Sequence, residues 1–371
     1  MLSVIPEVAI RCIPLRFISE NFSFIAFVKS WNGNEKIIDH FVTNSNIDLT
    51  AHFIRPNFFL TETGGGGLVL RTYSLLRRKI FILIKKSYFM GICALCEKEK
   101  ELCGSHFIPK FVFDWIKKTS ATGYLRQAIN INKRLQDGAK EKFLCLECEN
   151  KFSKYEKYFA DNFFYPYLDK KKTSFTYDES LQKFIVSISW RLLKKDLDGF
   201  KAFQPEMFEY AKQAEKYWKK ILLNDELDGK YEHHLFLFDY IENSSIDLPK
   251  RFQWYTMRAT DGTIASSKSE AFLFVKLPSI FFISSIFPAS IKDYWKNTLI
   301  EKRGILKVPQ SSEHPGFWDF LQSRVELSNK NEPSERQRNK IGETALKDLK
   351  KIRNSKSFEV WLEEEKNKRK L

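Results

Sequence analysis

The sequence predicts an α+β protein in which a zinc module is followed by a mixed helical and antiparallel β domain. The zinc module is marked by two C-x2-C pairs, Cys93/Cys96 and Cys145/Cys148. Four thiolates complete a closed tetrahedral shell around Zn2+, so we expect a structural zinc ion there. Apolar residues recur at helical spacing over residues 180–194 and again after Pro205. Apolar runs bounded by turn residues then predict strands beyond residue 231.

Composition limits the classes of function. The 371 residues are enough for two domains with a core. The net charge of +15 indicates a polyanionic partner, and no apolar run approaches the ~20 residues of a membrane-spanning helix. Cys12 and Cys103 are the only cysteines outside the pairs, which favours a reducing cytoplasm over a disulfide framework. G-x-S-x-G and G-x-G-x-x-G motifs are absent, which argues against serine hydrolases and dinucleotide binding.

Residues 1–89 show no sustained helical or strand period. Residues 64–67 are four glycines without the following Lys-Ser/Thr of a phosphate-binding loop, so we interpret them as a flexible linker. Met90 stands just before the first cysteine pair. We therefore expect residues 1–89 to be an N-terminal extension that is disordered, or not part of the native protein.

The residues between and after the cysteine pairs carry a resemblance. Between the pairs stands Ser105-His106-Phe-Ile-Pro109-Lys110, and Glu149 directly follows Cys148. This order resembles the HNH (His-Me finger) nuclease family over residues 90–167, in a variant with Ser-His and Cys-Glu. The resemblance implies a ββα-metal, treble-clef-like module. It also implies that His106 is the general base and that Glu149 helps bind a catalytic Mg2+ or Mn2+.

The sequence departs from the usual family pattern at three positions. Ser105 stands where a metal-binding Asp is usual, and Glu149 replaces the final His. The carboxylate suits Mg2+, which prefers oxygen ligands. No Asn lies directly before the second cysteine pair, and the upstream candidates for it are Asn130 and Asn132. These departures affect the catalytic part of the pattern, while the zinc pairs are complete.

Each candidate residue also has a plainer interpretation. His106 is either the base, a fifth metal ligand or a buried structural histidine. Glu149 is either a metal ligand or an acid that stabilises the start of a helix. Cys103 is not expected to replace a thiolate, because both pairs are complete without it.

Within the module, Pro109 predicts the start of a helix that ends before Gly123. Residues 124–132 are expected to be a strand, residues 136–138 a turn, and residues 141–144 the partner strand. Residues 149–164 predict a helix with one aromatic stripe, interpreted as core rather than as a base-stacking platform: Phe152, Tyr155, Phe159 and Phe163.

Beyond residue 170 the pattern becomes mixed. The helix after Pro205 carries lysines on its outer face, which either touch phosphates or are simply solvated: Lys212, Lys216, Lys219 and Lys220. His233 and His234 lie on an expected strand over residues 231–240. They should point to opposite faces, one toward the core and one toward a cleft beside the zinc module.

Further elements complete this region. We expect strands over residues 252–258, 263–266, 271–276, 279–287 and 304–308. Asp261-Gly262 is expected to be a hairpin turn. Helices are expected over residues 315–325 and, highly charged, from residue 341 onward.

The predicted organisation is an extension (1–89), an HNH-like zinc module (90–170) and an α+β domain with a charged helical tail (171–371). The expected function is metal-dependent hydrolysis of phosphodiester bonds in nucleic acid, with DNA favoured as partner and no membrane. Proteins of this kind resemble restriction or phage-defence factors. The alternative is a non-catalytic zinc-stabilised module that binds nucleic acid or another protein. Ser105 and the missing Asn favour that alternative.

Overall fold

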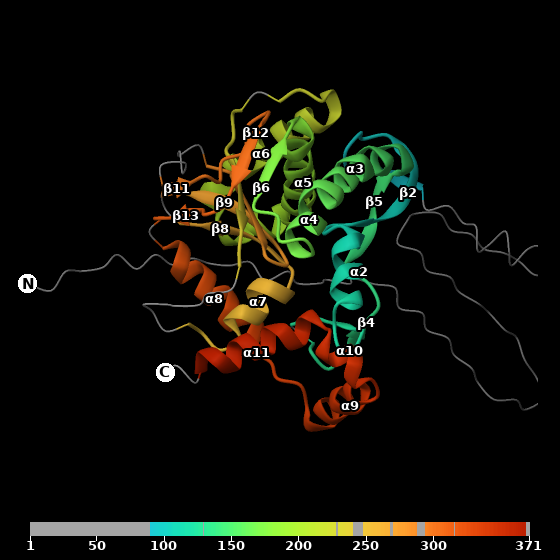
Figure 1. The fold of residues 1–371 in the computed structure, drawn as a ribbon. Helices are drawn as coiled ribbons and strands as arrows, with labels where there is room; N and C mark the ends of the chain where they lie inside the picture. The colour runs from blue at the N-terminus through green and yellow to red at the C-terminus, as the bar shows by residue number, and fades with distance from the viewer. Residues whose placement is uncertain are drawn as a thin grey trace, which may run out of the picture. The chain divides into compact units, whose positions relative to one another are not determined.

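A computed structural model describes residues 90–128, 130–227, 229–239, 248–267, 270–287, 294–314 and 316–368. The predictions for residues 1–89 lie outside these ranges. The elements of the predicted zinc module, shown in Figure 1, are β1 Met90–Ile92, β2 Glu99–His106, α2 Lys110–Lys118, β3 Leu125–Arg126, β4 Arg134–Leu135, β5 Lys140–Cys145, α3 Leu146–Phe159, a π-helical turn η1 Ala160–Phe164 and α4 Tyr165–Leu168.

The rest of the chain confirms a mixed α+β fold with antiparallel sheets. Its elements are β6 Ser174–Tyr177, α5 Glu179–Phe203, α6 Pro205–Asn224, β7 His233–Leu237, α7 Phe252–Arg258, β8 Asp261–Ser266, β9 Ala271–Leu277, β10 Ile280–Ser285, β11 Trp295–Lys296, β12 Gly304–Lys307, β13 Ser311–Ser312, α8 Phe317–Asn329, α9 Glu335–Leu346, α10 Leu349–Arg353 and α11 Lys356–Lys368.

Strand β2 is the centre of the three-stranded sheet β1-β2-β5. It pairs with β5 so that Leu102 lies opposite Cys145 and His106 lies opposite Lys140. The prediction that residues 124–132 pair with residues 141–144 is therefore wrong. Only Leu125–Arg126 of that segment is a strand, and it pairs with β4. Strand β5 pairs instead with the longer strand β2, and this pairing brings the two cysteine pairs together.

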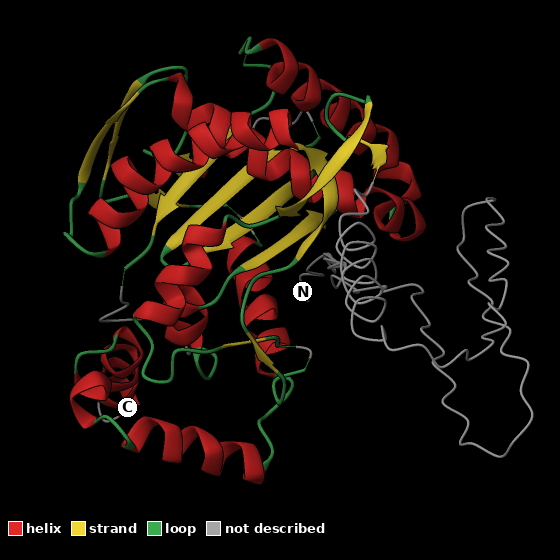
Figure 2. Cartoon of the chain, turned by 90° about the vertical axis from the view of Figure 1, so that its right-hand side faces the viewer, coloured by secondary structure: helices red, strands yellow, loops and turns green. Residues whose placement is uncertain are grey.

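Helices lie on both sides of the four-stranded sheet β7-β10-β9-β8 (Figure 2), and nearly all residues of its strands are buried. Alternate residues of a strand point to opposite faces. In β9, Leu273 and Val275 pack into the cluster that contains α5 and α6. Phe272 and Phe274 pack on the other side with α7 and α8. Because helices cover both faces, these strands carry continuous apolar runs without the alternation of a sheet with one solvated face.

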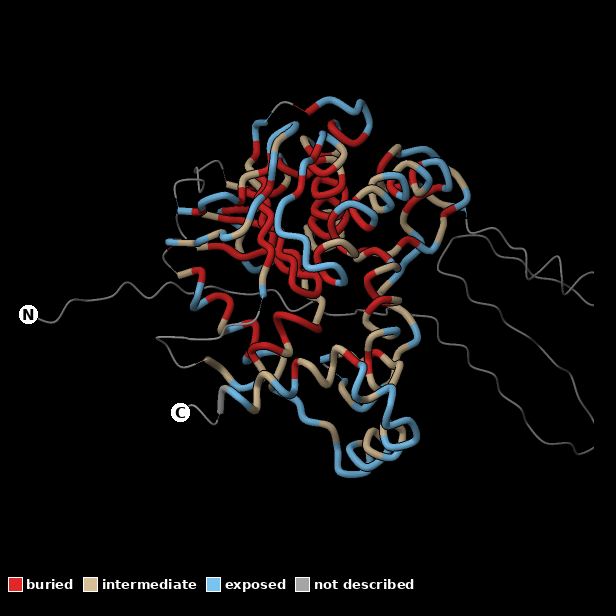
Figure 3. Tube along the Cα trace, in the orientation of Figure 1, coloured by how far each residue is buried: buried red, intermediate tan, exposed pale blue. Residues whose placement is uncertain are grey.

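The hydrophobic core continues across the boundary predicted at residue 170 (Figure 3). Phe159 of α3 stacks on Phe184 of α5 with ring centroids 4.1 Å apart. Its edge-to-face contact with Phe282 of β10 has centroids 5.5 Å apart. The aromatic stripe of α3 is thus core, as expected, and it joins the zinc module to the sheet.

Most predicted helices are confirmed. The segment 180–194 lies within α5, which is capped by Asp178 at its start and continues to Phe203. The helix predicted from Pro205 is α6. The charged tail forms three helices, α9 to α11. None of the described helices is long and apolar enough to cross a membrane.

Three strand-related predictions are wrong. Residues 252–258 form helix α7, because Phe252 and Tyr255, one helical turn apart, both pack on one face of the sheet. Asp261-Gly262 begins strand β8 and is not a turn, since both Asp261 carboxylate oxygens are bound by Arg324. The strand expected over residues 304–308 was predicted to continue the main sheet, but β12 pairs with β6 instead.

Candidate metal centre and His106 site

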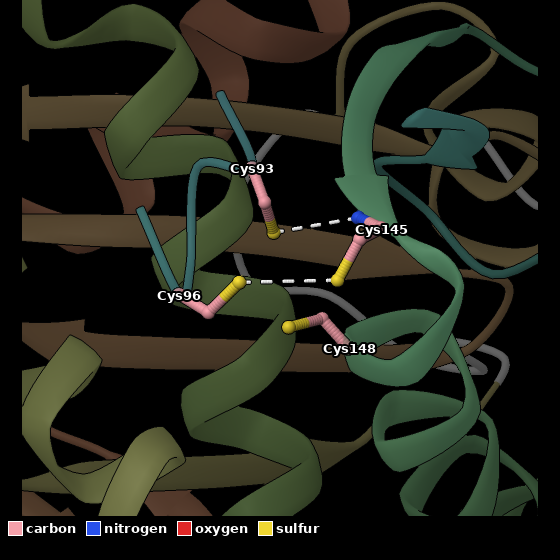
Figure 4. A group of neighbouring side chains, drawn as sticks. All are labelled: Cys93, Cys96, Cys145 and Cys148. Carbon is pink, nitrogen blue, oxygen red and sulfur yellow. Dashed lines mark hydrogen bonds between the residues drawn. The ribbon is translucent and has the colours of Figure 1, made fainter. Parts of the chain in front are cut away.

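The two cysteine pairs converge in space. Cys93 and Cys96 lie in the turn between β1 and β2, Cys145 ends β5, and Cys148 lies in the first turn of α3 (Figure 4). Their four Sγ atoms lie within 4.8 Å of one another, and those of Cys96 and Cys145 are 3.9 Å apart. Zn–S bonds of about 2.3 Å at tetrahedral angles separate sulfurs by about 3.8 Å. The cysteines therefore form a site that can hold a structural metal ion such as zinc.

Backbone groups shape the first cysteine turn and favour one thiolate. The N–H of Cys93 donates to the carbonyl of Lys98 at 3.0 Å, and the N–H of Cys145 donates to the Sγ of Cys93 at 3.3 Å. Burial alone would raise the pKa of Cys93, but backbone hydrogen bonds outweigh it and lower the pKa to about 7. Burial and the neighbouring thiols raise the pKa of Cys148. A bound cation would remove the cost of ionising all four sulfurs together.

The imidazole of His106 is held by a carboxylate that the sequence analysis treated only as part of a turn. Nε2 of His106 lies 2.9 Å from Oδ2 of Asp137. The other oxygen of Asp137 accepts from the N–H of Gly138 at 2.9 Å. Burial by itself raises the pKa of Asp137, but the bonds from His106 and Gly138 outweigh it, and the pKa lies below its usual range. Asp137 is therefore a carboxylate at neutral pH.

The sequence contained a signal for Asp137 that depends on register. His106 lies opposite Lys140 in the β2–β5 ladder, and Asp137 comes three residues before Lys140. Pairing of β2 with β5 thus brings the turn that enters β5 beside the end of β2. Because residues 141–144 were predicted to pair with another segment, the proximity of Asp137 to His106 could not be predicted.

A buried arginine fixes the backbone of His106. Arg191 of α5 is 1% exposed, and its Nη1 donates to the carbonyl oxygen of His106 at 2.7 Å. The same Nη1 lies 2.8 Å from Oε1 of Glu156 in α3. Arg191 thus joins the end of β2 to two helices, a role that the sequence analysis missed because only the fold brings these segments together.

Ser105 is a structural residue. It is fully buried, and its Oγ accepts from the N–H of Leu144 at 3.1 Å. Adjacent residues in a strand point to opposite faces, so Ser105 points into the module while His106 points toward Asp137. The hydroxyl of Ser105 is therefore used in an internal hydrogen bond.

Glu149 lies in the first turn of α3, near Cys103. Burial is the main cause that raises the pKa of the Cys103 thiol, and the negative charge of Glu149 raises it further. Oε1 of Glu149 is buried and has no hydrogen-bond partner in the described part of the chain. No hydrogen bond or ion pair joins Glu149 to His106. Among the described residues, the four cysteines of the two pairs are the only group of three or more His, Cys, Asp or Glu side chains that can hold an ion.

The other candidate residues lie elsewhere. Asn132 accepts from the N–H of Ser334, which places it against the C-terminal helices. His233 and His234 are both buried: Nδ1 of His233 bonds Ser284 and Nδ1 of His234 bonds Thr298. Burial lowers the pKa of His233 to about 3. The expectation that one of the two faces a cleft is therefore wrong.

Several lysines surround the His106 site and the cysteine turn. Nζ of Lys140 lies 3.3 Å from Oδ2 of Asp137. Nζ of Lys195 lies 4.2 Å from the ring centroid of Phe107, the residue after His106. On the α6 face, Lys219 pairs with Glu97 of the cysteine turn. At least one lysine of that face therefore links elements of the fold.

Comparisons with known proteins add no family to this description. No family model, curated protein or solved structure matches the chain. A functional proposal therefore depends on the chemistry of residues 93–149 and of the elements packed around them.

Proposed function

We propose that the chain is a metal-dependent endonuclease of the HNH type that hydrolyses phosphodiester bonds of nucleic acid. The observation that carries the proposal is the 2.9 Å contact of His106 with Asp137, at the end of the strand that leaves the cysteine cluster. A histidine oriented by a carboxylate is the arrangement of a general base.

The module that presents this histidine supports the proposal. The β2–β5 hairpin runs directly into α3, with one cysteine pair before the hairpin and one at the start of the helix. We assign this arrangement to the ββα-metal, treble-clef-like class. In that class the zinc ion fixes the two ends of the module and does not take part in the reaction, because a shell of four thiolates leaves no open position.

The proposed chemistry begins with the tautomer of His106. Because Asp137 is ionised, the Nε2–H of His106 donates a hydrogen bond to that carboxylate, and Nδ1 keeps its lone pair. Nδ1 accepts a proton from a water molecule as the water oxygen bonds to phosphorus. The bond from phosphorus to the leaving 3′ oxygen breaks, and that oxygen takes a proton from solvent. Asp137 stabilises the imidazolium, and Arg191 holds the backbone of His106 in place.

Glu149 fits the role of a ligand for the divalent ion of such a nuclease. Its Oε1 is a buried carboxylate oxygen without a hydrogen-bond partner among the described residues. Mg2+ is often bound by one or two carboxylates together with waters and substrate phosphates, so a group of three protein ligands is not required. When bound, such an ion supplies charge stabilisation at the phosphate and the leaving oxygen.

A cleavage assay with matched variants tests the proposal. The full chain, with zinc retained, is incubated with supercoiled plasmid, single-stranded DNA or RNA and Mg2+ or Mn2+. His106→Ala should lower the rate by at least about 100-fold, the contribution of a general base. Glu149→Gln should also lower it and shift the ion concentration that is needed. Glu147→Gln, at an exposed carboxylate two residues away, should leave the rate unchanged.

The opposite results are equally clear. Cutting that persists in His106→Ala would show that another group is the base. Binding of nucleic acid at low salt by wild type, without cutting of any substrate, would favour a non-catalytic zinc module. The internal hydrogen bond of Ser105 is the observation that favours this second candidate.

A further inference from the structure

Two arginines face each other in the short hairpin that precedes Asp137. Arg126 of β3 is the direct cross-strand partner of Arg134 of β4. Like charges directly opposite each other in an antiparallel pair are destabilising. Both residues are half-buried, so solvent screens the repulsion incompletely. A local cost of this kind suggests that an anion binds between them.

Among the described residues, the hydrogen-bond partners of the two guanidinium groups are all neutral. Nη1 of Arg126 donates to the carbonyl of Ile131 at 2.9 Å, and the amide oxygen of Gln337 in α9 accepts from its Nη2 at 2.8 Å. Nη2 of Arg134 donates to Oγ1 of Thr344 at 3.5 Å. In the described ranges, no carboxylate lies within 4.0 Å of either arginine. Burial and then the charge of Arg134 lower the pKa of Arg126.

The surroundings add positive charge and an aromatic surface. The guanidinium of Arg134 lies 4.4 Å from the ring centroid of Tyr124. Nζ of Lys351 lies 3.7 Å from the position that a Cβ at Gly123 would take. Residues 335–356, which form α9, α10 and the start of α11, carry eight Lys or Arg and three Asp or Glu. The hairpin and these helices thus form one basic surface.

This surface adjoins the His106 site. Arg134 comes three residues before Asp137, a path of at most about 10 Å at the rise of an extended chain. Lys117 of α2 donates to the carbonyl of Gln136 at 2.8 Å and holds the connecting turn against the module. Each strand of a duplex carries one phosphate per ~3.4 Å of helix axis, so phosphates within a few nucleotides of His106 can reach the arginines.

We propose that Arg126 and Arg134 form a phosphate clamp that binds the backbone of the nucleic-acid substrate a few nucleotides from the bond cleaved at His106. The clamp rests on the proposed function for its substrate. A phosphate between the guanidinium groups offsets their mutual repulsion and accepts hydrogen bonds from both planar forks. The neutral partners hold each fork in place without neutralising it, which leaves both charges for the ligand.

Binding to a nuclease-inactive chain tests the clamp without interference from cleavage. In the full-length His106→Ala protein, the affinity for a short fluorescein-labelled DNA duplex and for one of its single strands is measured by anisotropy over a range of salt. Arg126→Gln/Arg134→Gln should weaken binding about tenfold. The slope of log affinity against log salt should fall by about one, the contribution of one phosphate contact.

Two further variants separate the clamp from general charge and from folding. Arg303→Gln removes an exposed arginine just before β12, which Figure 1 draws at the opposite end from β4, and should change affinity little. Arg134→Lys keeps the charge and loses the planar fork, and should still weaken binding. The melting temperature of the double variant should change little, because removal of the repulsion offsets the loss of the hydrogen bonds to neutral partners.

Each other outcome is decisive. The clamp is overturned if the double variant binds as tightly as Arg303→Gln. If the double variant does not fold, the same criterion applies to Arg134→Lys. Weakened binding by the variants, together with no cleavage by wild type, keeps the clamp and overturns the nuclease. Failure of every form to bind either DNA or the same strand as RNA at low salt overturns both.

Discussion

The two ends of β2 carry sites of opposite character. Near the start of the strand, Cys93 and its three partner cysteines are mostly buried and point at one another. At the end of the strand, the His106 side chain meets one carboxylate, and lysines lie nearby. The first site is closed and can hold a structural metal ion. The second presents an oriented titratable group beside positive charge.

The difference teaches how stability and chemistry are separated within one small hairpin. The cysteine cluster joins the turn after β1, the end of β5 and the start of α3, so it stabilises the module. His106 depends instead on residues outside the hairpin, since Asp137 orients its ring and Arg191 holds its carbonyl. Changes at the first site should therefore destabilise the module most, and changes to the His106 and Asp137 side chains should alter activity more than folding.

The largest expected effect is loss of the metal. Cys145→Ser removes a buried thiolate and should lower the free energy of unfolding by more than about 5 kcal/mol, since metal binding is coupled to folding in such sites. Metal content by mass spectrometry and melting by circular dichroism measure the effect. Cys103→Ser, outside the cluster, should retain both metal and stability. Full metal retention in Cys145→Ser would contradict the four-cysteine site.

A smaller loss is expected when the link between the hairpin and the helices is cut. Arg191→Met leaves the His106 carbonyl and Glu156 without their shared donor, and should cost about 3 kcal/mol in urea unfolding, as for other broken buried pairs. Metal content should not change. Arg303→Met, at an exposed site, should cost less than about 0.5 kcal/mol. Loss of metal in Arg191→Met would show that the two ends of β2 are not separable.

The smallest effect on stability is expected for Asp137→Asn, together with an about tenfold to hundredfold loss of cleavage because the ring loses its orienting carboxylate. The folded protein holds the pKa of Asp137 below its usual value. Its stabilising contribution is therefore complete above the unfolded pKa of about 3.9 and is lost as pH falls through the folded value. The stability gap between wild type and Asp137→Asn should close in acid. A gap that persists there would contradict an ionised Asp137.

Some features of the candidate site could be predicted from sequence because they are local. The spacing of the cysteine pairs predicts a shared metal site, and their sulfur atoms do converge. The helical spacing of apolar residues predicts α5, α6 and the buried stripe of α3. The helical predictions succeed because a helical period is fixed by neighbours in the chain. The cysteine prediction succeeds because one C-x2-C pair supplies only two ligands, so a four-thiolate site needs both pairs.

Other features depend on which segments pair, and sequence patterns do not determine that. Residues 252–258 are rich in aromatic residues and resemble a strand, yet packing of Phe252 and Tyr255 against the sheet makes them a helix. In the sequence, Asp137 is typical of a turn residue. Only the pairing of β2 with β5 places it beside His106. In the sequence, nothing distinguishes Arg191 from another arginine on a long helix. Only the fold places the carbonyl of His106 beside it.

The sequence by itself determined the four cysteines that can hold a metal ion, the major helices and the positive charge of this protein. Only the tertiary structure decided the partner of His106, the burial of Ser105 and the facing arginines of the β3–β4 hairpin. The physical reason is that these contacts join residues through strand register and helix packing. Both are set by the burial of apolar faces across the whole core and not by the local chain.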